Sequence, residues 1–294
     1  MSGAFGARLD AALDTRGSMC AGIDPHPALL QAWGLPDDVS GLERFARSCV
    51  EAFGSTVAVV KPQSAFFEAY GSGGIRVLEH TIAACREAGA LVVLDVKRGD
   101  IGTTMAAYAR AYLDPASSLA SDAITASPYL GVGSLLPAFE LAEQYGAGVF
   151  VLALTSNPEG AQVQHARGAD GRTVAQAIID ELAARNAGRT PMGSFGVVAA
   201  ATIETSAARL ERLNGPILVP GIGAQGGTPE DVARAFGDTL SGIVPSVSRE
   251  ILRYGPEVAL LRSALNEQIA DFEFLRRDLR AQEPADSKKS GMSL

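Results

Sequence analysis

Short apolar runs alternate with longer helical segments along almost the whole chain, and this alternation limits its fold more than any other feature. Eight runs have the composition of buried strands: residues 19–24, 56–61, 91–97, 122–127, 148–154, 195–200, 216–221 and 241–246. The run from Leu91 to Leu94 is aliphatic at every position, which is typical of a parallel strand covered on both faces. Segments between the runs, such as 74–89 and 173–188, have apolar residues at three- and four-residue spacing, as crossover helices do.

Repeated strand–helix units predict a parallel sheet with helices between its strands. Eight such units in 294 residues favour a closed (β/α)8 TIM barrel, with a doubly wound open sheet as the alternative. Because 47% of the residues are hydrophobic, a chain of this length can form one large core. No linker-like segment interrupts the alternation, so we expect one barrel domain over residues 1–280. Residues 281–294 have the composition of a disordered tail.

Composition and charge exclude several classes of partner. The net charge of −8, without a cluster of Lys or Arg, argues against a nucleic-acid surface. The three cysteines have no metal-ligand spacing, and the three histidines have no i, i+4 partner, so we expect reduced thiols, a cytoplasmic protein and no metal site. No apolar run approaches the length of a membrane span, and the N-terminal stretch lacks the long apolar region of a secretory signal.

Charged side chains lie where several expected strands end, which is the active face of a barrel. The first two strands end at Asp24 and Lys61, and the third carries Asp95 and Lys97, followed by Asp100. Residues two apart on a strand point to the same face, so Asp95 and Lys97 should project toward one site. Two carboxylates flanking Lys97 would keep it protonated and able to donate a proton. The alternative is a salt-bridge network that holds a loop, because D-x-K-x-x-D alone is a weak pattern.

Glycines in G-x-G-x-x-G spacing follow the seventh expected strand: Gly221, Gly223 and Gly226. A dinucleotide site would need the first strand–helix unit and an acidic residue ending the next strand, which here ends in Pro245 and Ser246. A phosphate monoester fits better, because glycines let backbone N–H groups approach phosphate oxygens and Arg249 supplies a planar cation. Thr228 and Pro229 have the pattern of a helix start. A purely structural glycine turn is the alternative.

A long polar segment, residues 155–173, follows the fifth expected strand. Its glycines and polar residues are typical of a mobile lid over a substrate, and also of a passive surface loop.

The order of these motifs resembles one enzyme family over nearly all of the expected barrel. The matching features are Asp24, Lys61, the segment D-x-K-x-x-D-I-x-x-T from Asp95 to Thr104, the segment PGIGAQGG, and Arg249. Together they resemble the orotidine 5′-phosphate decarboxylase family, and the KPQSAFFE segment is similar to its longer bacterial branch. The resemblance implies a TIM barrel that decarboxylates orotidine 5′-monophosphate to uridine 5′-monophosphate, the last step of de novo UMP synthesis, without cofactor or metal.

The resemblance also implies roles at the reacting end of the substrate. Asp24 and Lys61 would contact the ribose hydroxyls, and Lys61 would join a charge array with Asp95, Lys97 and Asp100. Asp95 would face the substrate carboxylate. Lys97 would deliver a proton to C6 as carbon dioxide leaves.

Other implied roles concern the dimer, the base and the phosphate. Asp100, Ile101 and Thr104 would reach into the neighbouring subunit's site, which makes the family member a homodimer. Ser156, or the adjacent Thr155, would hydrogen-bond the pyrimidine. The phosphate would be held by the loop after strand seven and by the arginine after strand eight: Gly223, Gln225, Gly226 and Arg249.

Three other functions remain open on the sequence. A related phosphosugar decarboxylase or aldolase shares the D-x-K-x-x-D segment, but such relatives place an acidic residue where Lys61 stands and bind magnesium. A Schiff-base aldolase would need Lys61 or Lys97 with a lowered pKa. The third is a barrel that binds a phosphorylated metabolite without turnover.

Overall fold

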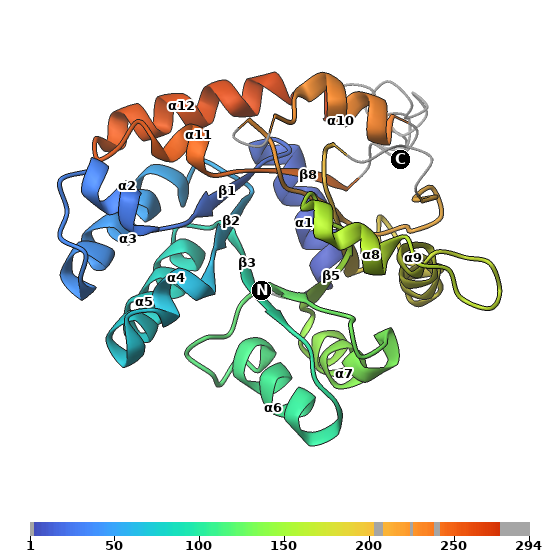
Figure 1. Cartoon of the computed structure of the whole chain (residues 1–294). Coiled ribbons are helices and arrows are strands. Elements are labelled where there is room, and N and C mark those ends of the chain that lie inside the picture. Colours follow the sequence, from blue (N-terminus) through green and yellow to red (C-terminus); the bar gives the residue numbers. More distant parts are fainter. Residues whose placement is uncertain (1–2, 203–207, 224–225, 238–241, 277–294) are drawn as a thin grey trace, which may run out of the picture.

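Eight parallel strands close into a barrel in the part of the chain that the structure describes, residues 3–202, 208–223, 226–237 and 242–276. In this computed structural model the strands follow one another in sequence order around the barrel, and β1 pairs with β8 to close it (Figure 1). The predicted (β/α)8 barrel is therefore confirmed, and the open sheet is wrong. Residues 281–294 lie outside the described residues, so the disordered tail and the single domain over 1–280 stay predictions.

Each strand overlaps one of the expected apolar runs. The strands are β1 (Cys20–Ile23), β2 (Val59–Pro62), β3 (Leu91–Arg98), β4 (Ala123–Ala126), β5 (Gly148–Leu154), β6 (Phe195–Ala199), β7 (Ile217–Val219) and β8 (Ile243–Val247). Nearly all of their residues are buried, as expected for strands that have the barrel interior on one face and helices on the other. Local composition thus located the strands, with small errors at their ends.

Apart from α1, the helices lie around the outside of the barrel (Figure 1). The longer ones are α1 (Phe5–Arg16), α3 (Val39–Phe53), α5 (Gly71–Glu87), α6 (Gly102–Leu113), α7 (Leu136–Tyr145), α9 (Val174–Asn186), α10 (Pro229–Phe236) and α12 (Val258–Asp271). The short ones are α2 (Pro27–Ala32), α4 (Ser64–Glu68), α8 (Ala161–Gln164), α11 (Arg249–Leu252), and the 3-10 turns η1 (Val132–Leu135) and η2 (Pro158–Gly160). Across the described ranges, none of the helices has both the length and the hydropathy needed to span a membrane.

Two of these helices begin at clear capping residues. The Asp38 side chain accepts hydrogen bonds from the backbone N–H groups at the start of α3. Thr228 caps α10 in a reciprocal capping box with Asp231, and Pro229 is the first helical residue. The predicted start of this helix is therefore confirmed.

Helix α1 packs against the strands of the barrel and was not expected from the sequence. Phe5, Leu9 and Leu13 are fully buried and form one apolar cluster with residues of all eight strands. Phe5 meets Phe150 of β5 edge to face, with ring centroids 5.9 Å apart. Most of the strand residues in this cluster are at or near the first residue of their strand, so α1 covers the N-terminal end of the barrel, opposite the polar side chains at the C-terminal ends.

Candidate active site

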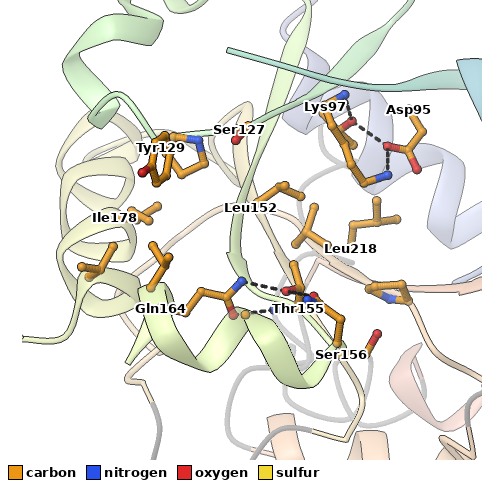
Figure 2. A pocket seen from close by; sticks show the side chains of 18 of the residues that line it. Asp95, Lys97, Ser127, Tyr129, Leu152, Thr155, Ser156, Gln164, Ile178 and Leu218 are labelled. Carbon is orange, nitrogen blue, oxygen red and sulfur yellow. Dashed lines mark hydrogen bonds and ion pairs between the residues drawn. The ribbon is translucent and has the colours of Figure 1, made fainter. Parts of the chain in front are cut away.

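A pocket of about 710 Å³ opens at the C-terminal ends of the strands. Figure 2 shows the charged side chains Asp95 and Lys97 at one end of it, with Tyr129 and Ile178 at the other and Leu152 between them. The pocket also has polar groups from the loop after β5, Thr155, Ser156, Asn157 and Gln164. A charged end beside an apolar floor suits a small anionic ligand with a flat, partly apolar body.

The Asp95 carboxylate accepts four hydrogen bonds, two on each oxygen. Oδ1 lies 2.6 Å from Lys97 Nζ and 2.7 Å from Thr125 Oγ1. Oδ2 lies 3.0 Å from Lys61 Nζ and 2.9 Å from Gln63 Nε2. Two donors come from β2 and the residue directly after it, one from β3, the strand of Asp95 itself, and one from β4, so three neighbouring strands supply them. The orientation of the carboxylate is consequently fixed before any ligand arrives.

This array has strongly perturbed protonation equilibria. Burial by itself would raise the pKa of Asp95, but the charges of Lys61 and Lys97, with hydrogen bonds from Lys97 and Thr125, hold it well below its ordinary value. Burial would lower the pKa of Lys61, yet the negative charges of Asp95 and Asp24 raise it above the ordinary lysine value. Asp95 is therefore ionised and Lys61 protonated at neutral pH.

Lys97 reaches Asp95 through irregular backbone. The sequence argument placed both side chains on one face of a regular strand, but the pairing of β3 with β4 shifts register between Leu94 and Arg98. Lys97 itself has a φ of 44°, in the left-handed region, and its backbone N–H donates to Thr125 Oγ1 at 2.9 Å. The expected proximity is present, but a bulge and a tertiary hydrogen bond position the lysine.

Asp24 directly follows β1, one residue beyond the observed end of the strand, and within the described ranges has buried polar atoms without partners around it. Asp24 Oδ1 and Ser248 Oγ are buried without a hydrogen-bond partner among the described residues. Both side chains face Gly22: a Cβ built there would lie 3.3 Å from Asp24 Oδ2 and 2.8 Å from Ser248 Cβ. Glycine at this position keeps the space beside Asp24 open.

Asp100, Ile101 and Thr104 do not line this pocket. The Asp100 carboxylate accepts from the backbone N–H of Ile101 at 2.8 Å, Ile101 is 63% exposed, and Thr104 is exposed on α6. Within the described ranges, the ion pair of Lys97 is with Asp95 alone. The expectation that two carboxylates of the same chain flank Lys97 is therefore wrong for Asp100, because the chain turns away after Arg98 into α6.

The segment after β5 is more ordered than the expected loop over 155–173. It contains η2 and α8, and the side chain of Gln164 on α8 clamps Thr155. Gln164 Oε1 accepts from the Thr155 N–H at 3.0 Å, and Gln164 Nε2 donates to Thr155 Oγ1 at 2.7 Å (Figure 2). The hydroxyl and backbone N–H of Thr155 are thus both used in contacts with α8. Ser156 is exposed and lines the pocket.

The glycine segment after β7 forms a tight turn. Gly221, Gly223 and Gly226 all have positive φ, which glycine adopts at no steric cost. The N–H groups of Gly223 and Gly226 donate within the turn, to Gly227 O at 2.8 Å and Gly223 O at 2.7 Å. Contrary to the expectation from the sequence, these two N–H groups are therefore not free to bind an anion. Gln225 lies outside the described residues.

Arg249 follows β8, as predicted, and is the first residue of α11. Its side chain is exposed, and no ion pair holds it in the part of the chain that the structure describes. An exposed guanidinium beside the active face can recruit an anionic group from solvent.

Sequence reasoning missed three side chains that shape the pocket: Gln63, Thr125 and Gln164. Each is a neutral hydrogen-bonding residue in or next to a strand or helix, where its type alone has no functional signal. In the described ranges, no group of three or more His, Cys, Asp or Glu side chains is placed so that it could hold a metal ion.

The fold and pocket define a (β/α)8-barrel enzyme whose site is built on a lysine–aspartate–lysine array. The model of the orotidine 5′-phosphate decarboxylase / HUMPS family matches residues 18–264, and the chain belongs to this family. The resemblance seen in the sequence is confirmed, together with the enzyme class it implied, a carbon–carbon lyase.

Relatives match over most of their length. The chain is 61% identical to the orotidine 5′-phosphate decarboxylase of Salinispora tropica over 267 residues, covering 91% of this chain and 96% of the relative. It is 60% identical to that of Streptomyces coelicolor over 260 residues, covering 88% and 94%.

Solved structures agree with this assignment. A crystal structure from Streptomyces avermitilis, 58% identical, superposes with a TM-score of 0.90 and covers 95% of this chain and 97% of its own. The OMP decarboxylase of Leishmania donovani, 30% identical, gives a TM-score of 0.70 and covers 92% and 99%.

Proposed function

We propose that this protein decarboxylates orotidine 5′-monophosphate to uridine 5′-monophosphate, without cofactor or metal. The observation that carries the proposal is the Asp95 carboxylate, buried and ionised between two lysines at the charged end of the pocket. Family membership supplies the substrate class, since the relatives are named for it.

The charge array explains how the reaction would be driven. A substrate carboxylate placed beside Asp95 would be repelled, by roughly 4 kcal/mol at about 4 Å and an effective dielectric constant near 20. Asp95 cannot turn away, because four donors hold it. Breaking the C6–carboxylate bond releases neutral carbon dioxide and leaves the electron pair on C6. Lys97 Nζ donates a proton to that carbon and is reprotonated from solvent.

The rest of the substrate would be held by the residues around the array. Asp24 and Lys61 would bind the ribose hydroxyls, and the buried, unpartnered Asp24 Oδ1 supports a ligand at this point. Ser156, which is exposed and lines the pocket, would bind the pyrimidine. The phosphate would be held by Gln225 and by Arg249 as its cation, and not by the N–H groups of Gly223 and Gly226, which are used within the turn. Binding energy at this remote group can be used to order the reacting end.

We also propose a homodimer that completes each site. Asp100, Ile101 and Thr104 are outside the pocket of their own chain, and Ile101 presents an apolar side chain that is 63% exposed in the single subunit. A second copy related by two-fold symmetry would bring these residues to the neighbouring pocket. We propose a cytoplasmic location as well, which three buried free cysteines support.

The rival functions fit the geometry less well. A magnesium-dependent phosphosugar enzyme would need an acidic residue at position 61, where a lysine pairs with Asp95. A Schiff-base aldolase needs a neutral amine, and the raised pKa of Lys61 opposes that role.

The test follows the ultraviolet absorbance of orotidine 5′-phosphate with purified protein and excess EDTA, beside the Lys97→Ala variant. Rapid loss of absorbance with the wild type alone is expected. No turnover by the wild type would refute the proposal, and turnover that disappears with EDTA would favour the magnesium-dependent rival. Binding of uridine 5′-phosphate without turnover would favour a barrel that only binds.

A further inference from the structure

We propose that Gln63 is a positioning residue of the decarboxylase site, acting through Asp95; this inference rests on the proposed function. Gln63 donates from Nε2 to Asp95 Oδ2 at 2.9 Å, on the oxygen that also accepts from Lys61. Of these two donors to Oδ2, Gln63 is uncharged and Lys61 is charged. The D-x-K-x-x-D motif and the second-strand lysine do not include it.

The backbone holds Gln63 in register with Asp95. Its N–H donates to Ile23 O at 3.1 Å, and Gln63 forms an isolated parallel bridge with Asp95 beyond the regular pairing of β2 with β3. Gln63 is also the N-cap residue of α4, where a side chain commonly accepts from the helix, but its side chain makes no cap hydrogen bond. The amide is directed at the carboxylate instead.

Helix α4 is in turn tied to the end of β3. Glu68 Oε1 accepts from Ser64 Oγ at 2.6 Å and from Arg98 Nη2 at 2.6 Å. Arg98 directly follows Lys97, so the same short helix anchors the residue after the proton donor and presents the amide to its partner carboxylate. Gln63 is therefore part of a rigid connection between β2 and the bulged end of β3, and not a flexible surface side chain.

The amide has a function that the lysines cannot supply. A lysine ammonium can follow a rotating carboxylate on its flexible four-carbon stem, whereas the shorter Gln63 side chain, extending from a backbone that is bridged to Asp95, can follow it less far. When the substrate carboxylate approaches, Asp95 would relieve the repulsion by rotating or by taking up a proton. The Gln63 hydrogen bond opposes both, since it stabilises the ionised form in one orientation.

The test compares Gln63→Leu and Gln63→Glu with the wild type, and uses Gln144→Glu, an exposed position on α7, as the matched charge control. Loss of a hydrogen bond to a charged group should lower kcat of Gln63→Leu by about 10- to 100-fold, with a much smaller change in KM. In Gln63→Glu the new carboxyl group, its pKa raised by Asp95, donates only when protonated. The kcat of this variant should therefore rise as pH falls relative to wild type, whereas Gln144→Glu should follow the wild-type profile.

The outcomes separate this inference from the function on which it rests. If the wild-type protein does not turn over orotidine 5′-phosphate, the proposed decarboxylase function is refuted. An active wild type with unchanged kcat in Gln63→Leu, or with the wild-type pH profile in Gln63→Glu, refutes the positioning role alone. Should Gln63→Leu fail to fold, the pH profile of the nearly isosteric Gln63→Glu decides.

Discussion

Lys97 Nζ lies 2.6 Å from Asp95 Oδ1, and the lysine makes this contact from a left-handed backbone with a φ of 44°. Residues with a Cβ occupy that region at a cost, and such strain persists where surrounding structure enforces it. Here the enforcing contacts are the hydrogen bond from the Lys97 N–H to Thr125 and the ion pair of Arg98 with Glu68. The position of Lys97, the proposed proton donor, thus depends on tertiary contacts as much as on the strand.

This conformation predicts a difference between two inactive variants. Lys97→Gly and Lys97→Ala both lose the ion pair and the proton donor, but glycine relieves the left-handed strain. Lys97→Gly should therefore be more stable than Lys97→Ala by about 1 kcal/mol in the free energy of unfolding. Urea denaturation measures the difference, and an alanine variant of equal or greater stability would contradict a strained backbone at this position.

The lowered pKa of Asp95 predicts how stability depends on acid. The unfolded carboxyl titrates near pH 3.9 and the folded one lower, so its contribution is fully present above about pH 4. It is lost as pH falls through the folded pKa. Near neutral pH the wild type should exceed Asp95→Asn by on the order of 3 kcal/mol in the free energy of unfolding. That gap should narrow as the pH is lowered below about 4; a gap independent of pH would mean that the ion pairs are not its source.

Arg249 is the first residue of α11 and Arg253 directly follows this helix, so substitutions of the two arginines form a matched pair. Arg253 is already paired with Glu250 at 2.9 Å, whereas Arg249 is exposed at the start of α11. Arg249→Ala should raise KM and lower kcat/KM by about 100-fold, because a charged hydrogen bond to phosphate is lost. Arg253→Ala should stay near wild type in steady-state kinetics. Equal effects of the two substitutions would remove Arg249 from the phosphate site.

Subunit mixing tests whether Asp100 serves the partner's pocket. Lys97→Ala and Asp100→Ala should each be inactive alone. In a mixed dimer one site would hold both defects and the other neither, so an equilibrated equal mixture should recover about a quarter of wild-type activity per chain. Mixing Lys97→Ala with Asp95→Asn is the control and should recover none, because both residues belong to one pocket. No recovery in the first mixture would place Asp100 in its own chain's site or outside both.

The three cysteines should be unreactive in the folded protein. Cys20, Cys49 and Cys85 are fully buried, and burial raises the pKa of Cys20 and of Cys85 to about 12. Ellman's reagent at pH 8 should label no thiol until the protein is unfolded, since the thiolate is the reactive form. An Ala116→Cys variant, at an exposed position, should be labelled at once. Rapid labelling of the wild type would mean that a core helix or strand opens readily.

The barrel architecture and the charged residues of its active face could be predicted from local sequence pattern. Strand composition and helical periodicity are local properties, so the eight strands were found close to their observed bounds. Parallel strands of a barrel place their C-terminal ends on one face, so the sequence predicts that Lys61, Asp95 and Lys97 share one site. All three line the same pocket.

The way in which those charges are held could not be predicted from local pattern, because it depends on contacts between different strands. Gln63 and Thr125 are ordinary polar residues until β2, β3 and β4 bring them within hydrogen-bond distance of one carboxylate. The bulge at Lys97 and the turn of Asp100 away from the pocket likewise follow from pairing between strands distant in sequence. Local pattern specifies which residues face the active end, whereas their orientation depends on contacts across about 30 residues or more, which periodicity does not encode.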